Sequence, residues 1–491
     1  RPLGIIYRDW GRGTIPPKVL IPGGNDYEIH PNADEMMYRL DKSRLQMFWY
    51  NPFNQVNIRA IWPNRDVNAQ TGTTTNVLVL QWKNDSIPDS LAWAGIMRST
   101  VNFPDQKKTK FIEMWVKGDK GRVNIDIGKI SEDFYVRENT FNFDDRPSLG
   151  NLNTEDRNLN GLLDIDEDVG LDGIPAGQPF ADPFDIWAAP QNSSPPFFRI
   201  NGTEGNGEAQ GAKYPDTEDL DGNGGLNTAN EYFTYSFDLS DEFNPYIDGS
   251  TAAGWKLYRI PIRAFDPDLV VGNPDTTFQE IYNVRLWINN LPIKPNDYDT
   301  LAIATFDFVG NEWEETGVAA DENSPFELND SLFSITVYNT EENAEPPQSY
   351  TSPPGVTGIE DRITRAVSKE QSLVMQLREL QPQAVAEANK QLYEKMDLIN
   401  YKKLKLFVHG SPELPTENSP LEFFIRFGPA QGIFYEIGTE VYPGWDERNF
   451  LDVVLDELAK TKSDEFFIGD TTNELYYRIN PDNPNQYFKV Q

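Results

Sequence analysis

The sequence predicts an all-β protein with two jelly-roll-like antiparallel β-sandwich domains, long calcium-binding loop insertions and an extended N-terminal arm. Three observations lead to this class. Short β-branched and aromatic runs recur from residue 77 onward, separated by Gly, Asn, Asp and Pro. Similar runs return in a similar order in the second half. Two acidic loops between such runs have the spacing of calcium loops.

The N-terminal segment is rich in Pro, Asn and Arg. Neither a helical nor an alternating period persists in it for long enough to make a domain. We therefore expect residues 1–76 to form an extended arm that packs on its neighbours.

The first sandwich is expected at residues 77–320. Its predicted strands lie in "NVLVLQW", "KFIEMWVKG", "RVNIDIG", "YFTYSFDL", "WKLYRIPI", "YNVRLWINN" and "IATFDFVGNEW". The alternation within these runs and the turn residues between them are typical of antiparallel strands. An acidic insertion at about 145–230 would carry both calcium loops.

A Pro-rich linker is expected at residues 321–358, because its Pro pairs at 346, 347 and 353, 354 cannot lie inside a sheet. Residues 359–491 would form the second sandwich, with runs "SLVMQL", "LKLFVHG", "LEFFIRFG" and "IFYEIGTEV" and a short helix near "QAVAEANKQLYEKM". Counterparts of the last two strands of the first sandwich are missing. We expect this domain to be truncated at its C-terminus, as part of a longer polypeptide.

Composition excludes several function classes. Acidic residues outnumber basic ones by 77 to 43, and the net charge of −34 repels nucleic acid and favours bound cations. With no Cys and two His, disulfides and thiolate metal sites are excluded, and a His-based triad or zinc site is disfavoured. No run reaches the roughly 18 apolar residues of a membrane helix, so no direct membrane span is expected in this segment.

The first loop is "DRNLNGLLDIDE", at residues 156–167. Oxygen-bearing side chains stand at its positions 1, 3, 5, 9 and 12, and Gly161 at position 6 permits the sharp turn of a calcium loop. The alternative is a solvated turn held by Asx hydrogen bonds. The predicted ligands are Asp156, Asn158, Asn160, Leu162 through its carbonyl, Asp164, and Glu167 with two oxygens.

The second loop, "DLDGNGGLNTAN" at residues 219–230, has the same register but ends on Asn230. Bidentate ligation would then require Glu231 from the next position. The predicted ligands are Asp219, Asp221, Asn223, Gly225, Asn227 and Glu231. Both loops lie between strands rather than between long helices, so a structural Ca²⁺ is expected and not a signalling switch.

Several phrases taken together resemble one family. They are "GRVNIDIGKISEDFY", "DRNLNGLLDIDEDVGLDGI", "PDTEDLDGNGGLNTANEYFTY", "GWKLYRIPI", "ATFDFVGNEW" and "TVYNTEENAEPPQSYTSPPGV". The chain resembles the SprA/Sov family, the very large outer-membrane translocons of the type 9 secretion system, over nearly its whole length. The resemblance implies an internal segment outside the barrel on the cell-surface side. It implies as partners the rest of the translocon, its outer-membrane subunits and secreted cargo, including gliding adhesins.

Three functions compete. The first is a non-enzymatic scaffold, cap or cargo contact of the translocon. The second is a calcium-stabilised carbohydrate-binding module of a surface polysaccharide-processing protein, which needs exposed coplanar rings. Its candidates are Trp82, Trp93, Trp115, Trp187, Trp255 and Trp287. The third is a hydrolase using Glu132 and Asp133, but adjacent acids in so acidic a chain are usually a solvated loop or ion ligands. No catalysis is expected.

Overall fold

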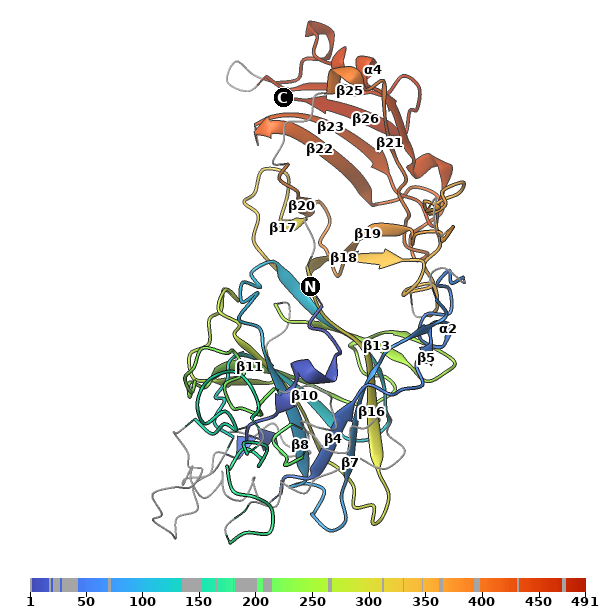
Figure 1. Ribbon diagram of the computed structural model, residues 1–491. Coiled ribbons are helices and arrows are strands. Elements are labelled where there is room, and N and C mark those ends of the chain that lie inside the picture. The colour runs from blue at the N-terminus through green and yellow to red at the C-terminus, as the bar shows by residue number, and fades with distance from the viewer. Residues whose placement is uncertain are drawn as a thin grey trace. The chain divides into compact units, whose positions relative to one another are not determined.

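The protein is described here from a computed structural model (Figure 1). The described residues are 2–16, 19–20, 27–28, 43–68, 72–134, 152–164, 166–179, 181, 201–205, 214–263, 267–310, 313–329, 331–346, 348–361, 365–392, 398–430, 432–469 and 474–491. The chain divides into two compact units. Unit 1 comprises Arg1–Thr351 and Gly358–Lys390, and unit 2 comprises Ser352–Thr357 and Gln391–Gln491.

Unit 1 is built on two antiparallel sheets, which confirms the predicted all-β class. Sheet 1 has the order β1 (Gly11–Arg12), β8 (Trp93–Ser99), β15 (Asn283–Asn289), β10 (Arg122–Lys129), β11 (Glu231–Asp238), β14 (Leu269–Val271). Sheet 2 has the order β12 (Ile247–Ser250), β13 (Lys256–Pro261), β9 (Thr109–Lys117), β16 (Asp299–Gly310), β7 (Leu78–Lys83), β4 (Gln46–Tyr50).

The two sheets share one hydrophobic core, as the layers of a β-sandwich do. Successive side chains along a strand point to opposite faces, so every second residue of β9 enters this core, with Ile112, Met114 and Val116 all buried. Across the core, the ring of Phe237 in sheet 1 stacks on that of Tyr258 in sheet 2, with centroids 4.0 Å apart. The bulk of the apolar burial in unit 1 therefore holds the two sheets together.

Residues of the predicted arm join the sandwich instead of only packing on it. The aromatic run Gln46–Tyr50 forms edge strand β4, and Gly11–Arg12 forms the short edge strand β1. Helix α2 (Ile58–Ile61) and Trp62 cover the outer face of sheet 2, where the Trp62 ring meets that of Trp115 edge-on. Short paired segments β2 (Val19–Leu20) with β3 (Tyr27–Glu28), and β5 (Val56–Asn57) with β6 (Thr74–Thr75), complete this region, and a 3₁₀ turn η1 spans Tyr7–Asp9.

The outer face of sheet 1 carries a buried ion pair. Arg285 Nε lies 2.7 Å from Asp126 Oδ2, and both side chains are fully buried. Trp287 Nε1 donates to the same oxygen at 2.9 Å, and Arg285 Nη1 donates to Thr14 Oγ1 of the N-terminal segment at 3.0 Å. Burial raises the pKa of Asp126, and Arg285 acts in the opposite direction. The pair therefore ties the N-terminal segment to the centre of sheet 1.

The boundary between the units differs from the predicted one. In the predicted linker, β18 (Phe333–Asn339) pairs in register with β19 (Gln371–Leu377), and β17 (Glu314–Ala319) pairs with β20 (Val385–Asn389). All four strands belong to unit 1, which extends to Lys390. A helix is expected near residues 383–396, but Val385–Asn389 of this range form β20 instead, because pairing with β17 overrides the helical preference of their Ala and Glu residues, and residues 393–396 lie outside the described residues.

Arg259 of β13 explains why the β18–β19 pair stays with the first unit. Its guanidinium donates to Thr336 Oγ1 at 2.8 Å and to the Val337 carbonyl at 3.4 Å, both on β18. The same group pairs with Glu113, and Nη1 lies 3.0 Å from Asp248 Oδ2. A charged contact between segments distant in sequence thus decides the domain boundary, and no local pattern signals it.

Unit 2 is also antiparallel and appears in orange to red in Figure 1. One sheet has the order β22 (Glu422–Ala430), β23 (Ile433–Glu440), β26 (Gln486–Val490), β25 (Tyr476–Ile479), and β21 (Lys403–Leu406) pairs with β24 (Leu451–Val454). Ile437, Phe488, Leu451 and Val453 share a core with Leu458 of helix α4 (Leu455–Ala459). Three 3₁₀ turns are η2 (Leu398–Asn400), η3 (Glu447–Asn449) and η4 (Asp464–Phe466). The run "SLVMQL", predicted as its first strand, is β19 of unit 1.

Replacing Arg285 by Met should lower the free energy of unfolding of unit 1 by about 3–5 kcal/mol, since it leaves the Asp126 carboxylate buried without its cation. The double variant Arg285→Met/Asp126→Asn should recover part of this loss, because it buries no charge. Urea unfolding of the full chain measures both. Arg365→Met, at an exposed Arg, is the matched control. Equal losses in the single and double variants would contradict the assigned role of the pair.

Asp307 of β16 lies directly opposite Glu113 of β9. Burial, and then the charge of Glu113, raise the pKa of Asp307 to about 6. The unfolded chain ionises first as pH rises, so the folded state loses stability between about pH 4 and about pH 6, and the loss persists above that. Asp307→Asn should therefore stabilise unit 1 more at about pH 8 than at about pH 4 in urea unfolding. An equal difference at both pH values would refute this.

Candidate functional site

The same triplet, Thr-Glu-Asp, leads into both acidic loops, at residues 154–156 and 217–219. Its Asp is position 1 of each loop. An antiparallel bridge pairs Thr154 with Thr217. Beside it, the Glu155 N–H donates to the Asp216 carbonyl at 2.9 Å, and the Glu218 N–H donates to the Asn153 carbonyl at 3.1 Å. The loops therefore start side by side, related by a short local repeat.

The first loop wraps its backbone around Asp156. The N–H groups of Asn160 and Gly161 donate to the two oxygens of its carboxylate at 2.9 and 2.7 Å. The Leu162 N–H donates to Asn160 Oδ1 at 2.7 Å, and Asn158 Nδ2 donates to Asp164 Oδ2 at 2.9 Å. The predicted ligand residues Asp156, Asn158, Asn160, Asp164 and Glu167 are thus linked in one network.

The second loop repeats these contacts at equivalent positions. The N–H groups of Asn223 and Gly224 donate to the two oxygens of Asp219 at 3.0 and 2.8 Å. The Gly225 N–H donates to Asn223 Oδ1 at 2.7 Å, and Asn227 Nδ2 donates to Asp221 Oδ2 at 2.9 Å. Two loops of different sequence therefore adopt the same turn.

Glycine at position 6 is required by the backbone. Gly161 has φ of 76° and Gly224 has φ of 79°, in the left-handed region, and a Cβ at either position would meet no atom within 4 Å. Conformation, and not lack of space, therefore selects Gly here. The glycine that helped to identify each loop in the sequence is therefore required by the left-handed backbone conformation at position 6.

The acid at position 12 is where the loops differ. In the first loop, buried Glu167 accepts the N–H of Arg157 at 3.2 Å and that of Asp164 at 3.0 Å, so it folds back over the loop. Glu231, predicted for the second loop, lies elsewhere. It is the first residue of β11, directly opposite Lys129, whose Nζ is 3.7 Å from its Oε2. Strand pairing directs its side chain to that Lys.

A different acid lies beside the second loop. Within the described ranges, one group of three carboxylates has oxygen atoms all within 4.8 Å of one another, namely Glu132, Asp219 and Asp221. Asn227 connects to this group, since its Nδ2 donates to Glu132 Oε2 at 3.0 Å. Glu132, considered above as a hydrolase acid, thus joins the oxygen cluster of the second loop.

Two further acids, Glu155 and Glu218, hold the loops in place. Neither was predicted from the sequence, because neither occupies a ligand position of a calcium loop. Glu155 is fully buried and accepts the N–H groups of Val169, Gly170 and Asp216 at 3.1, 2.9 and 2.7 Å. Burial, and then the charge of Asp216, raise the pKa of Glu155 to about 9. Its oxygens bind backbone, so Glu155 is a positioning residue for the insertion. The repeated Thr-Glu-Asp triplet was the available signal.

Glu218 plays the same part at the second loop. Its carboxylate accepts the N–H of Phe134 and the N–H of Asn153, both at 2.8 Å, and Asn153 Nδ2 at 2.9 Å. Burial raises the pKa of Glu218 to about 7. Each loop is therefore preceded by a buried acid whose carboxylate accepts hydrogen bonds from backbone N–H groups of other segments.

The insertion is anchored on the outer face of sheet 1. Leu220, between Asp219 and Asp221, packs against a buried apolar cluster comprising Met97, Ile130, Tyr232, Leu269 and Val271. This contact explains why an apolar residue stands at position 2 of an otherwise polar loop.

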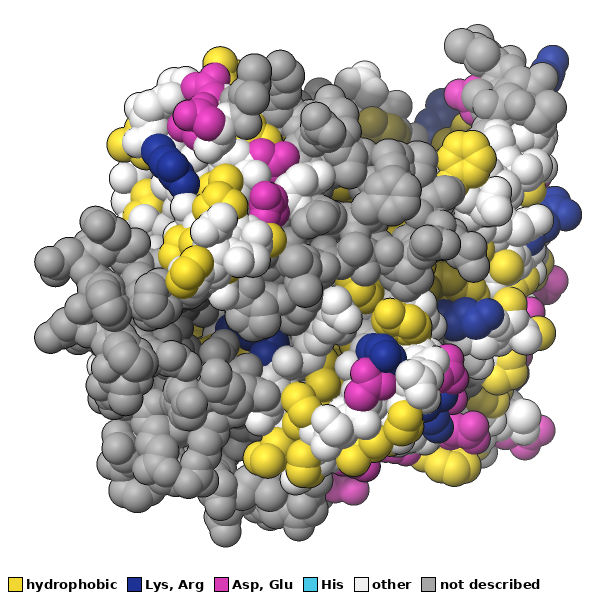
Figure 2. Space-filling model, turned by 60° about the horizontal axis from the view of Figure 1, so that its bottom comes forward, with side chains coloured by type: hydrophobic (Ala, Val, Ile, Leu, Met, Phe, Trp, Pro, Cys, Tyr) yellow, Lys and Arg dark blue, Asp and Glu magenta, His cyan; other side chains and the backbone are white. Residues whose placement is uncertain are grey.

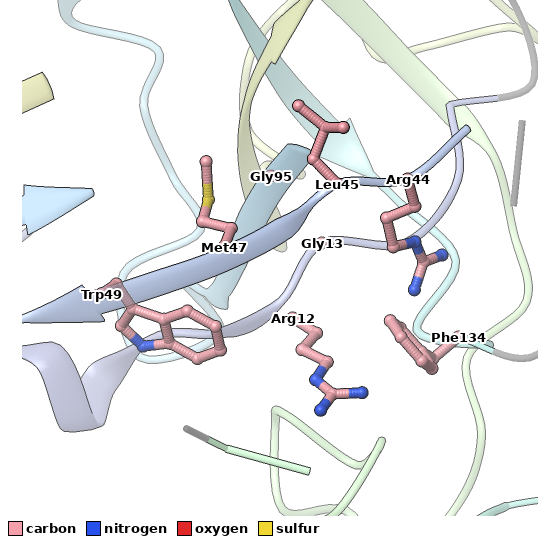
Figure 3. Close-up of a pocket in the computed structure, with 8 residues that line it drawn as sticks. All are labelled: Arg12, Gly13, Arg44, Leu45, Met47, Trp49, Gly95 and Phe134. Atoms are coloured by element: carbon pink, nitrogen blue, oxygen red, sulfur yellow. The ribbon is translucent and has the colours of Figure 1, made fainter. Parts of the chain in front are cut away.

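A small pocket lies beside this region, lined by Arg12, Gly13, Arg44, Leu45, Met47, Trp49, Gly95 and Phe134 (Figure 3). The guanidinium carbon of Arg44 is 3.9 Å from the centroid of the Phe134 ring, and that of Arg12 is 5.3 Å away. Stacking of this kind fixes Phe134, two residues after Glu132. The described residues that line the pocket include no carboxylate or His.

Charged side chains are mixed on the surface. On the described part of the face in Figure 2, acidic side chains lie interspersed with basic and hydrophobic ones. The net charge of −34 is therefore not collected into one patch on that part of the face.

Comparison with known proteins supports a family assignment. A model of the SprA_N family, described as motility related/secretion protein, matches residues 197–431. The match supports the assignment of the chain to the SprA/Sov family. The matched range contains the second loop and β11 to β22. No curated protein matches the chain.

One solved structure similar to this chain is the Family 11 Carbohydrate-Binding Module of cellulosomal cellulase Lic26A-Cel5E of Clostridium thermocellum. The sequence identity is 11%, the TM-score is 0.21, and the match covers 54% of this chain and 89% of that chain. At this TM-score neither a ligand nor a role can be transferred.

The tryptophans of the chain test the carbohydrate-binding alternative. Five of the six candidates, Trp82, Trp93, Trp115, Trp255 and Trp287, are at most 3% exposed. Trp187 lies outside the described residues. A sugar platform needs exposed rings, so these five side chains cannot form one. In the described ranges no helix is both long and apolar enough to cross a membrane.

Glu155→Ala should release the three amides that this carboxylate accepts. Hydrogen exchange at Val169, Gly170 and Asp216 should accelerate by about tenfold or more, the equivalent of one lost net hydrogen bond. Exchange followed by mass spectrometry on the full chain measures this. Exposed Glu242→Ala is the control and should leave these amides unchanged. Unchanged protection in Glu155→Ala would exclude the positioning role.

Proposed function

We propose that this chain is a non-enzymatic, cell-surface segment of a type 9 secretion and gliding motility outer-membrane translocon, where it serves as scaffold, cap or contact for cargo and partner subunits. The observation that carries the proposal is the family match, which makes the chain a motility-related or secretion protein. The partners proposed are other parts of the translocon, its outer-membrane subunits and secreted cargo.

A passive role fits the chemistry of the described residues. Two buried ion clusters, around Arg285 and Arg259, join distant segments of the fold. The buried acids Glu155 and Glu218 accept backbone N–H groups. Groups engaged in this way support structure, and we assign none of them to proton transfer.

Structural Ca²⁺ is the second part of the proposal. The side chains and carbonyls predicted to bind the ions offer oxygen atoms as ligands. A hard cation such as Ca²⁺ takes about six to eight oxygen ligands. The first ion would be held by Asp156, Asn158, Asn160, Asp164 and Glu167, with the carbonyl of Leu162. The second would be held by Asp219, Asp221, Asn223 and Asn227, with the carbonyl of Gly225. A bound cation would offset the repulsion among these carboxylates.

Calcium should therefore raise the melting temperature of the full chain, and chelation should lower it. At 100 times its dissociation constant, one ion adds about 2.7 kcal/mol of stability. Asp156→Asn should reduce the shift, because it removes a charged ligand of the first loop. Exposed Asp119→Asn is the matched control. Equal melting temperatures in Ca²⁺ and in chelator would contradict the ion-binding proposal.

The cell-surface location has its own test, which exploits the absence of Cys from the chain. Phe243 is 93% exposed, so Phe243→Cys in the protein as expressed in cells should react with a membrane-impermeant maleimide on intact cells. Ile125→Cys, at a fully buried position, is the unreactive control. The unsubstituted protein gives the background. Reaction of Phe243→Cys only after the outer membrane is permeabilised would place the segment on the other side and overturn the proposed location.

A further inference from the structure

The second loop lacks the acid that completes the first. Position 12 is Glu167 in the first loop and Asn230 in the second. Asn230 is already engaged, since its Oδ1 accepts the N–H of Ser131 at 3.2 Å. Glu231 faces Lys129, as described above. Neither residue therefore supplies the bidentate carboxylate that a calcium loop takes at this position.

Glu132 stands in the place that Glu167 has in the first loop. Position 9 is Asp164 in the first loop and Asn227 in the second, and the N–H of this residue marks where the closing acid lies. The Asp164 N–H donates to Glu167 Oε2 at 3.0 Å, and the Asn227 N–H donates to Glu132 Oε2 at 3.4 Å. The equivalent backbone group therefore contacts an acid in both loops, although the second acid comes from a distant segment.

The backbone fixes Glu132 in this position. Glu132 follows the end of β10 by three residues, and its N–H donates to the Asn227 carbonyl at 2.8 Å. In the other direction, Asn227 Nδ2 donates a hydrogen bond to Glu132 Oε2 at 3.0 Å. Three contacts thus hold the acid against the loop, so its approach does not depend on one side-chain rotamer.

The second carboxylate oxygen of Glu132, Oε1, is the observation that indicates a ligand. Glu132 is 1% exposed, and among the described residues its buried Oε1 has no hydrogen-bond partner. A buried carboxylate oxygen left without a partner is costly, so such groups are normally hydrogen-bonded or bound to a metal. One oxygen each of Glu132, Asp219 and Asp221 lie within 4.8 Å of one another, close enough for a single cation to contact all three.

We propose that Glu132 is the closing acidic ligand of the second loop, and that a divalent cation held by Glu132, Asp219 and Asp221 joins the acidic insertion to the end of strand β10. This inference rests on the proposed Ca²⁺ binding by the loops and replaces Glu231 with a ligand from another part of the chain.

The second ion would differ from the first in its mechanical effect. All predicted ligands of the first ion come from one continuous loop, so its binding orders that loop alone. The second ion would close a long chain segment between Glu132 and Asp219, and closing a long segment restricts the unfolded chain more than closing a short one. Its binding would therefore fasten the insertion onto sheet 1, where Leu220 already packs.

Calcium titration of the full chain by isothermal calorimetry tests this proposal. The unsubstituted chain should bind two ions. Glu132→Gln, which keeps the size of the side chain, should bind one ion with unchanged affinity and lose the other or weaken it roughly 100-fold. Glu231→Gln should bind two ions like the unsubstituted chain. Asp219→Asn, which removes the first ligand of the same loop, should match Glu132→Gln.

The outcomes separate this inference from the proposed function. Two undiminished ions in Glu132→Gln, with one lost in Asp219→Asn, would overturn the role of Glu132 and leave the loops as calcium sites. Loss of an ion in Glu231→Gln would restore Glu231 as the ligand. No binding by the unsubstituted chain would refute the proposed function itself. The ion retained in Glu132→Gln, together with an unchanged far-ultraviolet circular dichroism spectrum, shows that this variant is folded.

Discussion

Buried carboxylates need donors or cations, and this constraint governs the organisation of the molecule. In this strongly acidic chain, several acids are buried, and burial of a charge is costly unless it is paired or hydrogen-bonded. Asp126 meets Arg285, Glu113 meets Arg259, and Glu155 meets three backbone N–H groups. Each pairing joins segments that are far apart in the sequence, so the same contacts that satisfy the charges also define the tertiary structure.

The parts of the fold that follow from local rules were predictable. Runs such as "KFIEMWVKG" favour a strand that places every second residue on one face, and Ile112, Met114 and Val116 of β9 accordingly lie in the core. The loops were predictable for a similar reason, because Gly161 and Gly224 at φ near 80° are local requirements of the turn. Patterns with a period of two, and turns that need a left-handed residue, are visible in a sequence because neighbours along the chain determine them.

The parts that depend on distant contacts were not predictable. The boundary near Lys390 follows from Arg259 reaching Thr336, and the strand at Val385–Asn389 from pairing with β17. Glu231 was an attractive ligand because it is adjacent in sequence, but the register of β10 and β11 sets it against Lys129. Glu132 is separated from its loop by the whole insertion, and no spacing rule relates the two.

These observations favour a structural role for this segment. The family match supports a motility-related or secretion protein, and the buried acids Asp126, Glu113 and Glu155 are engaged in contacts that hold the fold together. We infer that cations gripped by two related loops brace the insertion, one within a loop and one between the insertion and sheet 1. Anomalous scattering from crystals of the chain grown with calcium tests this most directly. The account predicts one peak among Asp156, Asp164 and Glu167 and another among Glu132, Asp219 and Asp221, whereas ordered loops without peaks at these positions would contradict it.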